Sequence, residues 1–142
     1  MMGGGPDKDK KFINKLIKQI NNGQETLYIV NDKNGTPTYT HDFAKNVELL
    51  INNNLWGLFN MVCGGETSRL EVAKELIKQL GLINKIRIIE VESDYFKNEY
   101  FAERPTSERL INKRLDTLGL NIMRDWRVAL KEYIDNYYSK FL

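Results

Sequence analysis

The sequence "VNDKNGTPTYTHDFAKN", residues 30–46, joins a β-rich stretch to an amphipathic run through a bend that is rich in hydroxyl groups. The turn-forming residues and threonines of this bend are Asn34, Gly35, Thr36, Pro37, Thr38 and Thr40. Hydroxyls and exposed backbone N–H groups at the start of a helix suit sugar or phosphate oxygens. The same hydroxyls can instead cap the turn and the helix without any ligand. The residues of the bend alone leave both interpretations open.

Strand-like and helix-like patterns alternate on either side of the bend. "TLYIV" at residues 26–30 predicts a strand, and "GLFNMVC" (57–63) and "KIRIIEV" (85–91) predict two more. Apolar residues at helical spacing predict helices over residues 10–22, 43–51 with Thr40 as N-cap, 70–80 after a capping box from Ser68 to Glu71, 112–118, and 125–137. We therefore expect a small sheet with several amphipathic helices, of the α/β or α+β class.

Length and composition set broad limits on the protein. The chain has 142 residues and a mass of 16.6 kDa, with no internal repeat and no linker, so we expect a single domain over residues 1–142. The net charge of +2 is too small to demand a polyanionic partner. Cys63 is the only cysteine, which excludes an internal disulfide and any cysteine-built zinc site.

Neither a membrane span nor a secretory signal is evident in the sequence. A transmembrane helix needs a run of about 18 or more apolar residues, and the chain has none. Residues 1–11 carry charges but no apolar core follows them, so they do not resemble a signal peptide. We expect a cytoplasmic protein with no membrane partner.

Motifs for catalysis, dinucleotide binding or metal binding do not stand out. The glycines at residues 3–5 follow no strand, and Gly64-Gly65 lacks the third glycine of a dinucleotide fingerprint. No tyrosine has a lysine four residues later, the pair used by short-chain dehydrogenases. We expect His41 to be exposed in a first helical turn and Cys63 to pack as a small hydrophobe. The sequence therefore predicts no catalytic, cofactor-binding or metal-binding residue in this chain.

A second polar stretch, "YFAERPTSER" at residues 100–109, holds an arginine before a proline. Arg104 is biased towards an extended backbone because it precedes Pro105. Such a loop arginine can clamp a diphosphate, since the guanidinium fork matches phosphate oxygens. The alternative is a surface ion pair with a neighbouring glutamate, which contributes little stability.

These stretches together resemble one family. "DKNGTPTYTHDFAK", "GLFNMVCGGETSRLEVAKEL", "YFAERPTSERLINKRLDTLGL" and "MRDWRVALKEYI" are similar, in this order, to the carboxyl-terminal part of the dTDP-4-dehydrorhamnose reductases, which are extended short-chain dehydrogenases. The resemblance covers essentially the whole chain. It implies a lobe that binds a nucleotide-linked 4-keto-deoxysugar of the dTDP-sugar type. It also implies that a separate Rossmann half holds NADPH and the catalytic Tyr/Lys pair, so this chain alone is expected to bind no cofactor and to be inactive.

The resemblance carries substrate binding over to particular positions. These are Lys11, Phe12, Gly35, Thr36, Pro37, Thr38, Arg104 and Pro105. Lys11 departs from the family, in which many members have an asparagine near the sugar at this position. Arg69 departs as well, because many members carry a tryptophan there. The lysine removes the asparagine that would contact the sugar, and the arginine changes either the packing against the nucleotide or only a surface.

Two other functions remain open beside this one. Reductase-like folds also serve as non-catalytic regulatory or interaction subunits, as in methionine adenosyltransferase, and a fold does not fix a function. The basic stretch "KDKKFINKLIK" suggests a nucleic-acid-binding module. Phe12 and the stripe that contains Trp126 are expected to lie in the core, however, so we expect no nucleic-acid partner.

The helix expected over residues 10–22 leads to a prediction about assembly. Its apolar face carries Phe12, Ile13, Leu16, Ile17 and Ile20. A small lobe that lacks its Rossmann half is expected to leave part of this face exposed, and large exposed apolar patches usually meet a partner. We therefore expect the chain to self-associate or to bind a Rossmann-type subunit through this helix.

Overall fold

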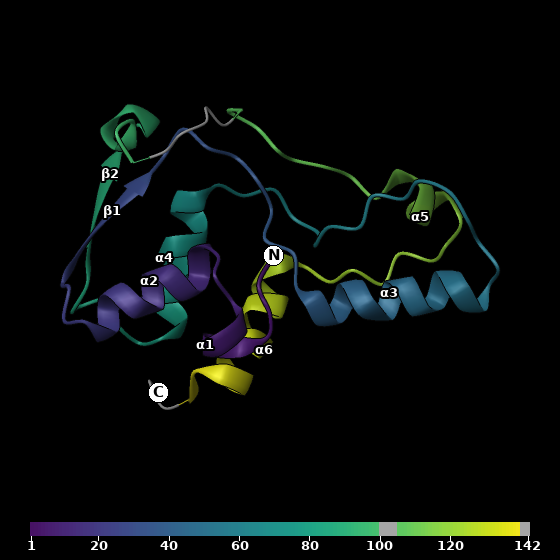
Figure 1. Cartoon of the computed structure of the whole chain (residues 1–142), viewed down its shortest axis with the longest axis horizontal. Coiled ribbons are helices and arrows are strands. Elements are labelled where there is room, and N and C mark those ends of the chain that lie inside the picture. The colour runs from purple at the N-terminus through teal and green to yellow at the C-terminus, as the bar shows by residue number, and fades with distance from the viewer. Residues whose placement is uncertain (100–104, 140–142) are drawn as a thin grey trace.

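The computed structural model describes residues 1–99 and 105–139, and its elements follow the apolar periodicity of the sequence (Figure 1). In chain order they are α1 (Gly5–Lys8), α2 (Phe12–Asn21), β1 (Thr26–Val30), α3 (Thr40–Asn52), α4 (Arg69–Gln79), β2 (Arg87–Val91), the 3-10 turn η1 (Ser93–Phe96), α5 (Lys113–Thr117) and α6 (Trp126–Tyr137). The predicted class, helices around a small sheet, is confirmed. Within the described ranges, no helix is both long and apolar enough to cross a lipid bilayer.

The helix starts agree closely with the capping signals in the sequence. The Ser68 hydroxyl accepts a hydrogen bond of 3.2 Å from the Glu71 backbone N–H, and the Asp125 carboxylate caps α6 in a similar way. Thr40 is the first residue of α3 rather than its N-cap, which is Tyr39. The predicted start of α3 is therefore wrong by one residue.

The sheet consists of β1 and β2, which pair in parallel with Tyr28 opposite Ile89. Parallel neighbours need a long crossover, and residues 31–86 supply it, with α3 and α4 inside it. Leu27 and Ile29 are buried, whereas Tyr28 between them is exposed, as expected for a strand with one covered face. α4 contacts β1 and also α2.

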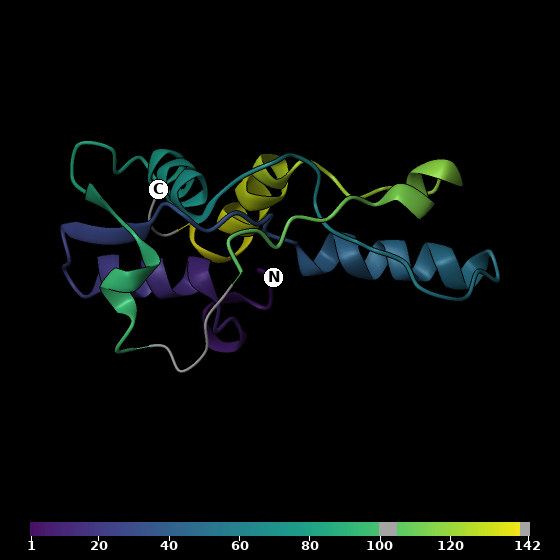
Figure 2. The same ribbon diagram turned by 90° about the horizontal axis from the view of Figure 1, so that it is seen from above.

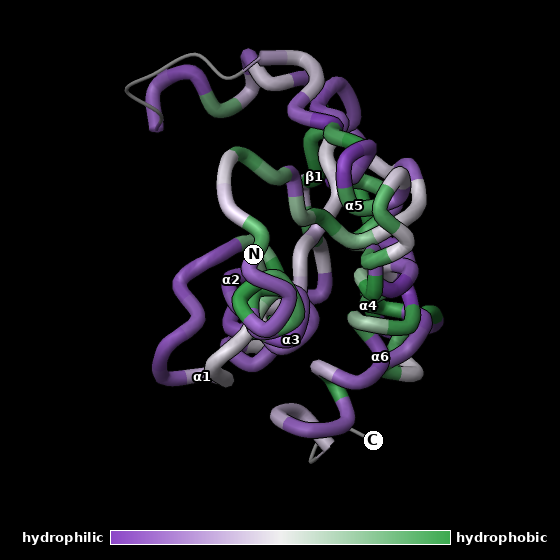
Figure 3. The backbone as a smooth tube through the Cα atoms, turned by 90° about the vertical axis from the view of Figure 1, so that its right-hand side faces the viewer, coloured by the Kyte–Doolittle hydropathy of each residue, from purple (hydrophilic) through white to green (hydrophobic). Residues whose placement is uncertain are grey.

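The centre of the core is supplied by α6, which contacts both α4 and α1. Trp126, Leu130, Tyr133 and Ile134 are each at most 1% exposed. Figure 3 shows hydrophobic residues recurring along α4 and α6 among hydrophilic ones. Fully burying a large apolar side chain contributes about 1.5–3 kcal/mol, so α6 supplies a substantial part of the hydrophobic stabilisation of the core.

The apolar face of α2 is covered by the chain itself, which makes the exposure expected from the sequence wrong. Ile13, Leu16 and Ile17 are buried in the core, and Phe12 and Ile20 are half-buried against it. The physical reason is that α2 packs on α4 within the same core that α6 fills. A charge at Ile17 is therefore expected to unfold the chain rather than to loosen an assembly.

The strand predicted over residues 57–63 is also absent from the described structure, where these residues form no regular element. They run beside α3 and the segment that carries α5. We call α3, residues 53–62 and residues 110–122 together the arm, because they project to one side of the core (Figure 2). The described chain has no strand beside residues 57–63, and a strand cannot form without a partner. Sequence propensity alone could not reveal this.

An ionic cluster fixes the root of the arm to the core. The Arg124 guanidinium donates to the carboxylate of Asp42 at 2.6–3.1 Å and to that of Glu132 at 2.5 Å. Asp42 lies in the first turn of α3, and Glu132 lies on α6. Asp42 is only 3% exposed, so its charge needs this partner. The cluster therefore sets where the arm leaves the core.

A buried polar network ties the first residues of the chain to its last helix. The Tyr133 hydroxyl donates to the Asp9 carboxylate at 2.7 Å, and the Tyr138 hydroxyl donates to the Asn14 side-chain oxygen at 2.9 Å. The Asn14 amide donates in turn to the backbone carbonyl of Asp9. Burial raises the pKa of the Tyr133 hydroxyl well above its usual value, as do its hydrogen bonds to Tyr138 and Asp9. The hydroxyl therefore remains protonated and acts as a donor.

Replacing Tyr133 with phenylalanine tests this network. The variant leaves a buried carboxylate oxygen of Asp9 without its donor, which costs about 1–3 kcal/mol. We expect the free energy of unfolding in urea to fall by about that amount. Tyr137→Phe is the matched control, because the Tyr137 hydroxyl makes only a 3.5 Å contact with His41. Equal stability of the two variants would contradict the role of the network.

A pH titration tests the ionic cluster. The hydrogen bond from Arg124 lowers the pKa of Glu132 below its ordinary value of 4.5. A carboxyl with a lower pKa in the folded state stabilises the fold above its unfolded pKa and loses this effect as pH falls through the folded pKa. We expect Glu132→Gln to be less stable than wild type at pH 7, and the difference in unfolding free energy to shrink in acid. Asp135→Asn, which alters an exposed pair with Lys131, should show a smaller difference throughout.

Candidate functional site

The bend (residues 31–40) is held by backbone hydrogen bonds to remote parts of the chain. The Asn34 N–H donates to the Thr106 carbonyl at 2.8 Å, and the Asn34 carbonyl accepts from the Glu108 N–H at 2.9 Å. Two further bonds of 3.1 Å join Lys33 and Gly35 to residues 67–69, just ahead of α4. The bend is thus a junction at which segments distant in sequence lie side by side.

The first residues of the chain complete this junction. The Met2 N–H donates to the Thr38 carbonyl at 2.8 Å, and the Met2 carbonyl accepts from the Thr40 N–H at 3.0 Å. Met2 is 1% exposed and belongs to the core. At Gly3, φ is +150°, and a Cβ atom there would lie 1.9 Å from the Thr40 hydroxyl oxygen. Only glycine fits at this close approach.

A pocket of about 220 Å³ opens at the junction. Its walls are the bend, the start of α2, the start of α4 and the loop after residue 104. Of the positions that the sequence assigns to substrate binding, those that line it are Lys11, Phe12, Gly35, Thr36, Pro37 and Pro105. Residues more than 90 positions apart are therefore gathered around one cavity.

Two assigned positions do not line this pocket in the described structure. Thr38 is a buried residue of the bend, only 6% exposed, and its carbonyl accepts a hydrogen bond from the Met2 N–H. Thr38 therefore supports the wall of the pocket through its backbone and does not line the cavity. Arg104 lies outside the described residues, so the prediction that it clamps a diphosphate stays a prediction.

One threonine hydroxyl of the bend is engaged within the chain. The Thr36 hydroxyl donates to the Gly65 carbonyl at 3.0 Å, which links the bend to the turn before α4. Thr38 is buried, and Thr40 packs against Gly3. Of the two interpretations that the sequence left open, internal capping accounts for the donor of Thr36. Thr36 itself is half-buried and lines the pocket, and a hydroxyl that donates one hydrogen bond can still accept others.

Positive charge and helix starts converge on the pocket. Within the described residues, the side chains of Lys11 and Arg69 have no hydrogen-bond or ion-pair partner, and both line it. Lys11 is also the N-cap of α2, and its side chain caps none of the first N–H groups of this helix. A helix N-terminus beside an unpaired lysine is a favourable place for a phosphate or another anion.

Some pocket residues were missed by reasoning from the sequence. Lys33, Val72 and Glu108 line the cavity, as do Met1 and Met2. Lys33 lies 4.0 Å from the Asp32 carboxylate, which moderates its charge. Nothing in the local sequence marks these residues, because only the long-range pairing of the bend brings them together. The Arg69 position was noted as a departure from the family but not as part of the site.

The histidine and the cysteine of the chain lie outside the pocket, and neither is arranged for catalysis. His41 is exposed, as predicted, and its Nδ1 atom lies 3.2 Å from the Tyr39 hydroxyl. Cys63 is 2% exposed, and burial raises the pKa of its thiol, which makes it a packing residue rather than a nucleophile. Within the described ranges, no group of three or more His, Cys, Asp or Glu side chains is arranged to hold a metal ion.

The fold and the pocket together define a small binding domain, and comparison with known proteins places it in a family. Residues 5–139 match the family described as the RmlD substrate binding domain. Because this match covers nearly the whole chain, the chain belongs to that family. The resemblance inferred from the sequence motifs is thereby confirmed.

Individual relatives agree with this assignment. The chain is 30% identical over 123 residues to the spore coat polysaccharide biosynthesis protein SpsK of Bacillus subtilis. This match covers 87% of the present chain and 41% of SpsK. A dTDP-4-dehydrorhamnose reductase from Yersinia enterocolitica matches with a TM-score of 0.85 and 30% identity, over 96% of this chain and 47% of that one.

A third likeness concerns the fold alone. A dTDP-4-dehydrorhamnose reductase from Bacillus anthracis, solved in complex with NADP, matches with a TM-score of 0.82 and 23% identity, over 92% of this chain and 44% of that one. The chain thus spans less than half the length of each of these relatives.

Proposed function

We propose that this chain is the substrate-binding part of a reductase that acts on a nucleotide-linked 4-keto-deoxysugar of the dTDP-sugar type. The observation that carries the proposal is the pocket at the bend, which is lined by six of the eight positions carried over from the reductase family. Membership of the RmlD substrate binding domain family supports it further. The pocket, rather than any catalytic group, is what this chain contributes.

The chemistry of the walls suits a nucleoside-diphosphate sugar. Lys11 and the start of α2 would meet the negative charge of the phosphates, with Arg69 adding a second cation. Gly35 and Pro37 would form the apolar, narrow side of the wall, and Thr36 would offer its oxygen lone pairs to the ligand. In this proposal Arg104 with Pro105 closes the pocket from the loop after residue 104.

Among the described residues, neither glycine cluster offers a site that fits a nicotinamide dinucleotide. The best candidate, the Gly64-Gly65 turn, has its backbone committed, because the Gly64 N–H donates to the Arg124 carbonyl at 2.9 Å and the Gly64 carbonyl accepts from the Trp126 N–H at 3.0 Å. α1, which follows the other glycine cluster, has only four residues, and Gly5 lies against the Tyr137 ring. NADPH and the groups that deliver hydride and proton would therefore belong to the other half of the reductase fold.

A second candidate function is that of a non-catalytic interaction subunit with a reductase-like fold. The observation that favours it is the arm, which projects from the core and exposes large apolar side chains such as Trp56 and Leu58. Binding a nucleotide-sugar distinguishes the two functions, because an interaction subunit has no need of it.

Arg69 provides a test of the pocket. We expect Arg69→Ala to weaken binding of dTDP-glucose, used as a stable probe, by about 2 kcal/mol or roughly thirtyfold, the effect of losing one hydrogen bond to a charged group. Isothermal titration calorimetry measures this directly. Arg87→Ala is the matched control, because Arg87 is an exposed arginine on β2 that does not line the pocket. Unchanged affinity in Arg69→Ala would remove Arg69 from the site, and no binding by wild type would refute the proposed function.

The lack of a dinucleotide site leads to a prediction about catalysis. We expect the purified chain alone not to oxidise NADPH in the presence of a dTDP-4-keto-6-deoxysugar, because it offers neither a dinucleotide site nor a Tyr/Lys pair. Absorbance at the nicotinamide band over time is the measurement, with an intact reductase as positive control. NADPH oxidation that depends on this chain alone would refute the proposal that the cofactor site and the catalytic groups lie in the other half of the reductase fold.

A further inference from the structure

The outer face of α2 carries a row of lysines that begins at the pocket. Lys11, Lys15 and Lys18 are all exposed, and we call them the lysine row. The Lys15 N–H donates to the Lys11 carbonyl at 3.0 Å, so Lys15 lies one helical turn beyond Lys11. Lys18 follows at a spacing of three residues, which keeps it on the same face of the helix. Since Lys11 lines the pocket, the lysine row leads along α2 to the cavity.

The charge of the lysine row is not cancelled by neighbouring carboxylates. α2 contains no aspartate or glutamate, and within the described residues none of its three lysine side chains makes an ion pair. Lysines on the other long helices of the core differ in this respect. On α4, Lys74 pairs with Glu90 at 3.0 Å, and on α6 the Lys131 ammonium lies 2.6 Å from a carboxylate oxygen. The lysine row therefore presents its positive charge to the solvent beside the pocket.

The placement of these lysines works against the stability of α2. The amino end of a helix carries partial positive charge, so acidic residues are favoured there and lysines are not. Lys11 is nevertheless the N-cap of α2, and Lys15 is its fourth helical residue. The buried Asp9 carboxylate, which accepts from the Lys11 N–H at 2.7 Å, offsets part of this cost. Like charges one turn apart also repel each other, and residues that oppose the local fold beside a pocket indicate a role in binding.

The lysine row is close enough to the pocket to act on a charged ligand before contact. With a rise of 1.5 Å per residue, Lys15 and Lys18 lie about 6 and 10 Å along the helix axis from Lys11. The electrostatic screening length is about 30 Å at 0.01 M salt and about 8 Å at 0.15 M, so their field extends to the pocket. The diphosphate of a nucleotide-sugar is a dianion at neutral pH. Cations that flank its site therefore accelerate its diffusional encounter without touching it.

From this arrangement we infer that Lys15 and Lys18 steer a nucleoside-diphosphate sugar electrostatically towards the pocket, where Lys11 meets the diphosphate. The two lysines act on the rate of association and make no contact with the bound ligand. Their role differs from that of Lys11 and Arg69, which line the cavity. The inference rests on the proposed function, because it requires an anionic ligand in the pocket.

Stopped-flow binding kinetics test the inference. The probe is dTDP-glucose with a fluorescent N-methylanthraniloyl group on its 3′ hydroxyl, and the α2 variant combines Lys15→Gln with Lys18→Gln. At about 0.01 M salt we expect the association rate constant to fall about threefold, the effect of removing two charges at this distance in water. At about 1 M salt, where screening is nearly complete, we expect the difference to vanish. The dissociation rate constant is expected to stay unchanged, because the contacts of the complex are intact.

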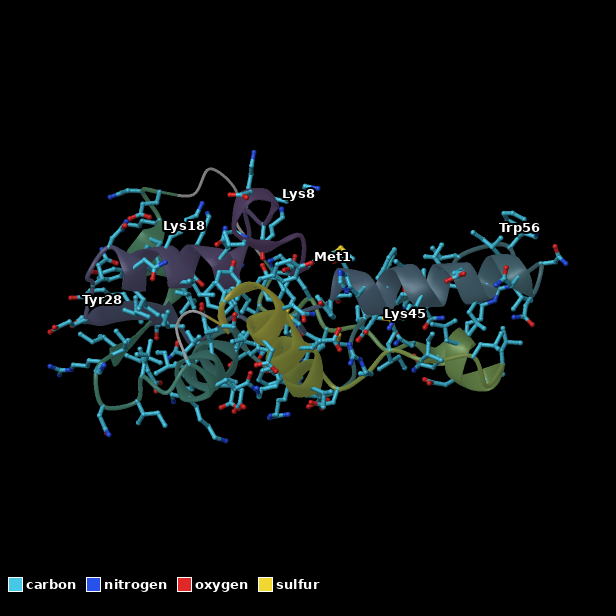
Figure 4. All side chains as sticks on the ribbon, turned by 90° about the horizontal axis from the view of Figure 1, so that it is seen from below. Met1, Lys8, Lys18, Tyr28, Lys45 and Trp56 are labelled. Atoms are coloured by element: carbon cyan, nitrogen blue, oxygen red, sulfur yellow. The ribbon has the colours of Figure 1, made fainter. Side chains whose placement is uncertain are left out.

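A second double variant with the same change in net charge provides the control. Lys45→Gln with Lys113→Gln also removes two exposed lysines that make no ion pair within the described residues, but these lie on the arm. Figure 4 shows Lys45 on α3, well separated from Lys18 on α2. We expect this control to bind with wild-type kinetics at both salt concentrations. The melting temperature of the α2 variant is expected to equal or exceed that of wild type, because repulsion along α2 is relieved.

Several results would overturn the inference. Equal association rates for wild type and the α2 variant at low salt would show that the two lysines do not steer the ligand. A loss of affinity that persists at about 1 M salt, or faster dissociation, would make them direct ligand contacts instead. Slower association together with a lower melting temperature would assign the effect to a weakened fold. These results leave the proposed function standing, whereas no binding of labelled or unlabelled dTDP-glucose by wild type would refute both.

Discussion

The structure depends on the backbone pairing of the bend with segments that are remote in sequence. Asn34, Gly35 and Thr38 exchange hydrogen bonds with residues near positions 106, 67 and 2 respectively. The sheet of the described chain has two strands, so these isolated backbone hydrogen bonds, rather than further strands, join the remote segments to each other. They satisfy backbone groups that burial would otherwise leave unpaired, at a cost of about 1–3 kcal/mol each. The position of every wall of the pocket follows from them.

The same pairing explains why the pocket forms where it does. By joining the bend to the turn before α4 and to the first residues of the chain, it brings the starts of α2 and α4 to one cavity. α6 supports this arrangement from the core, where Trp126 is buried. The Tyr133 hydroxyl of α6 also donates a hydrogen bond to Asp9, which precedes α2. Lys11 is held at the cavity because it precedes a helix whose next turns are buried. Rigid support of this kind is what a binding site needs, because it removes the ordering cost from the ligand.

Much of this architecture could be predicted from the sequence, and the failures share one cause. The strands at 26–30 and 85–91 and the caps at Ser68 and Asp125 are local features, and the structure has them. The strand at 57–63 and the exposed face of residues 12–20 were wrong, because both depend on what another part of the chain supplies. The sequence does not say that α4 and α6 cover α2, nor that the described part of the chain places no strand beside residues 57–63. Likewise, the family motif pointed to Gly35 and Pro105, whereas Lys33 and Glu108 reach the pocket only through long-range pairing.

The pocket and the arm are directly linked along the chain, because the bend that lines the pocket leads into α3. Thr40 ends the bend and begins α3, and the Arg124 cluster fixes the first turn of α3 to α6 through Asp42. Because Asp42 is only 3% exposed and pairs with Arg124, the first turn of this 13-residue helix cannot shift without breaking a buried ion pair. The position of α3 and the shape of the bend that lines the pocket therefore depend on each other.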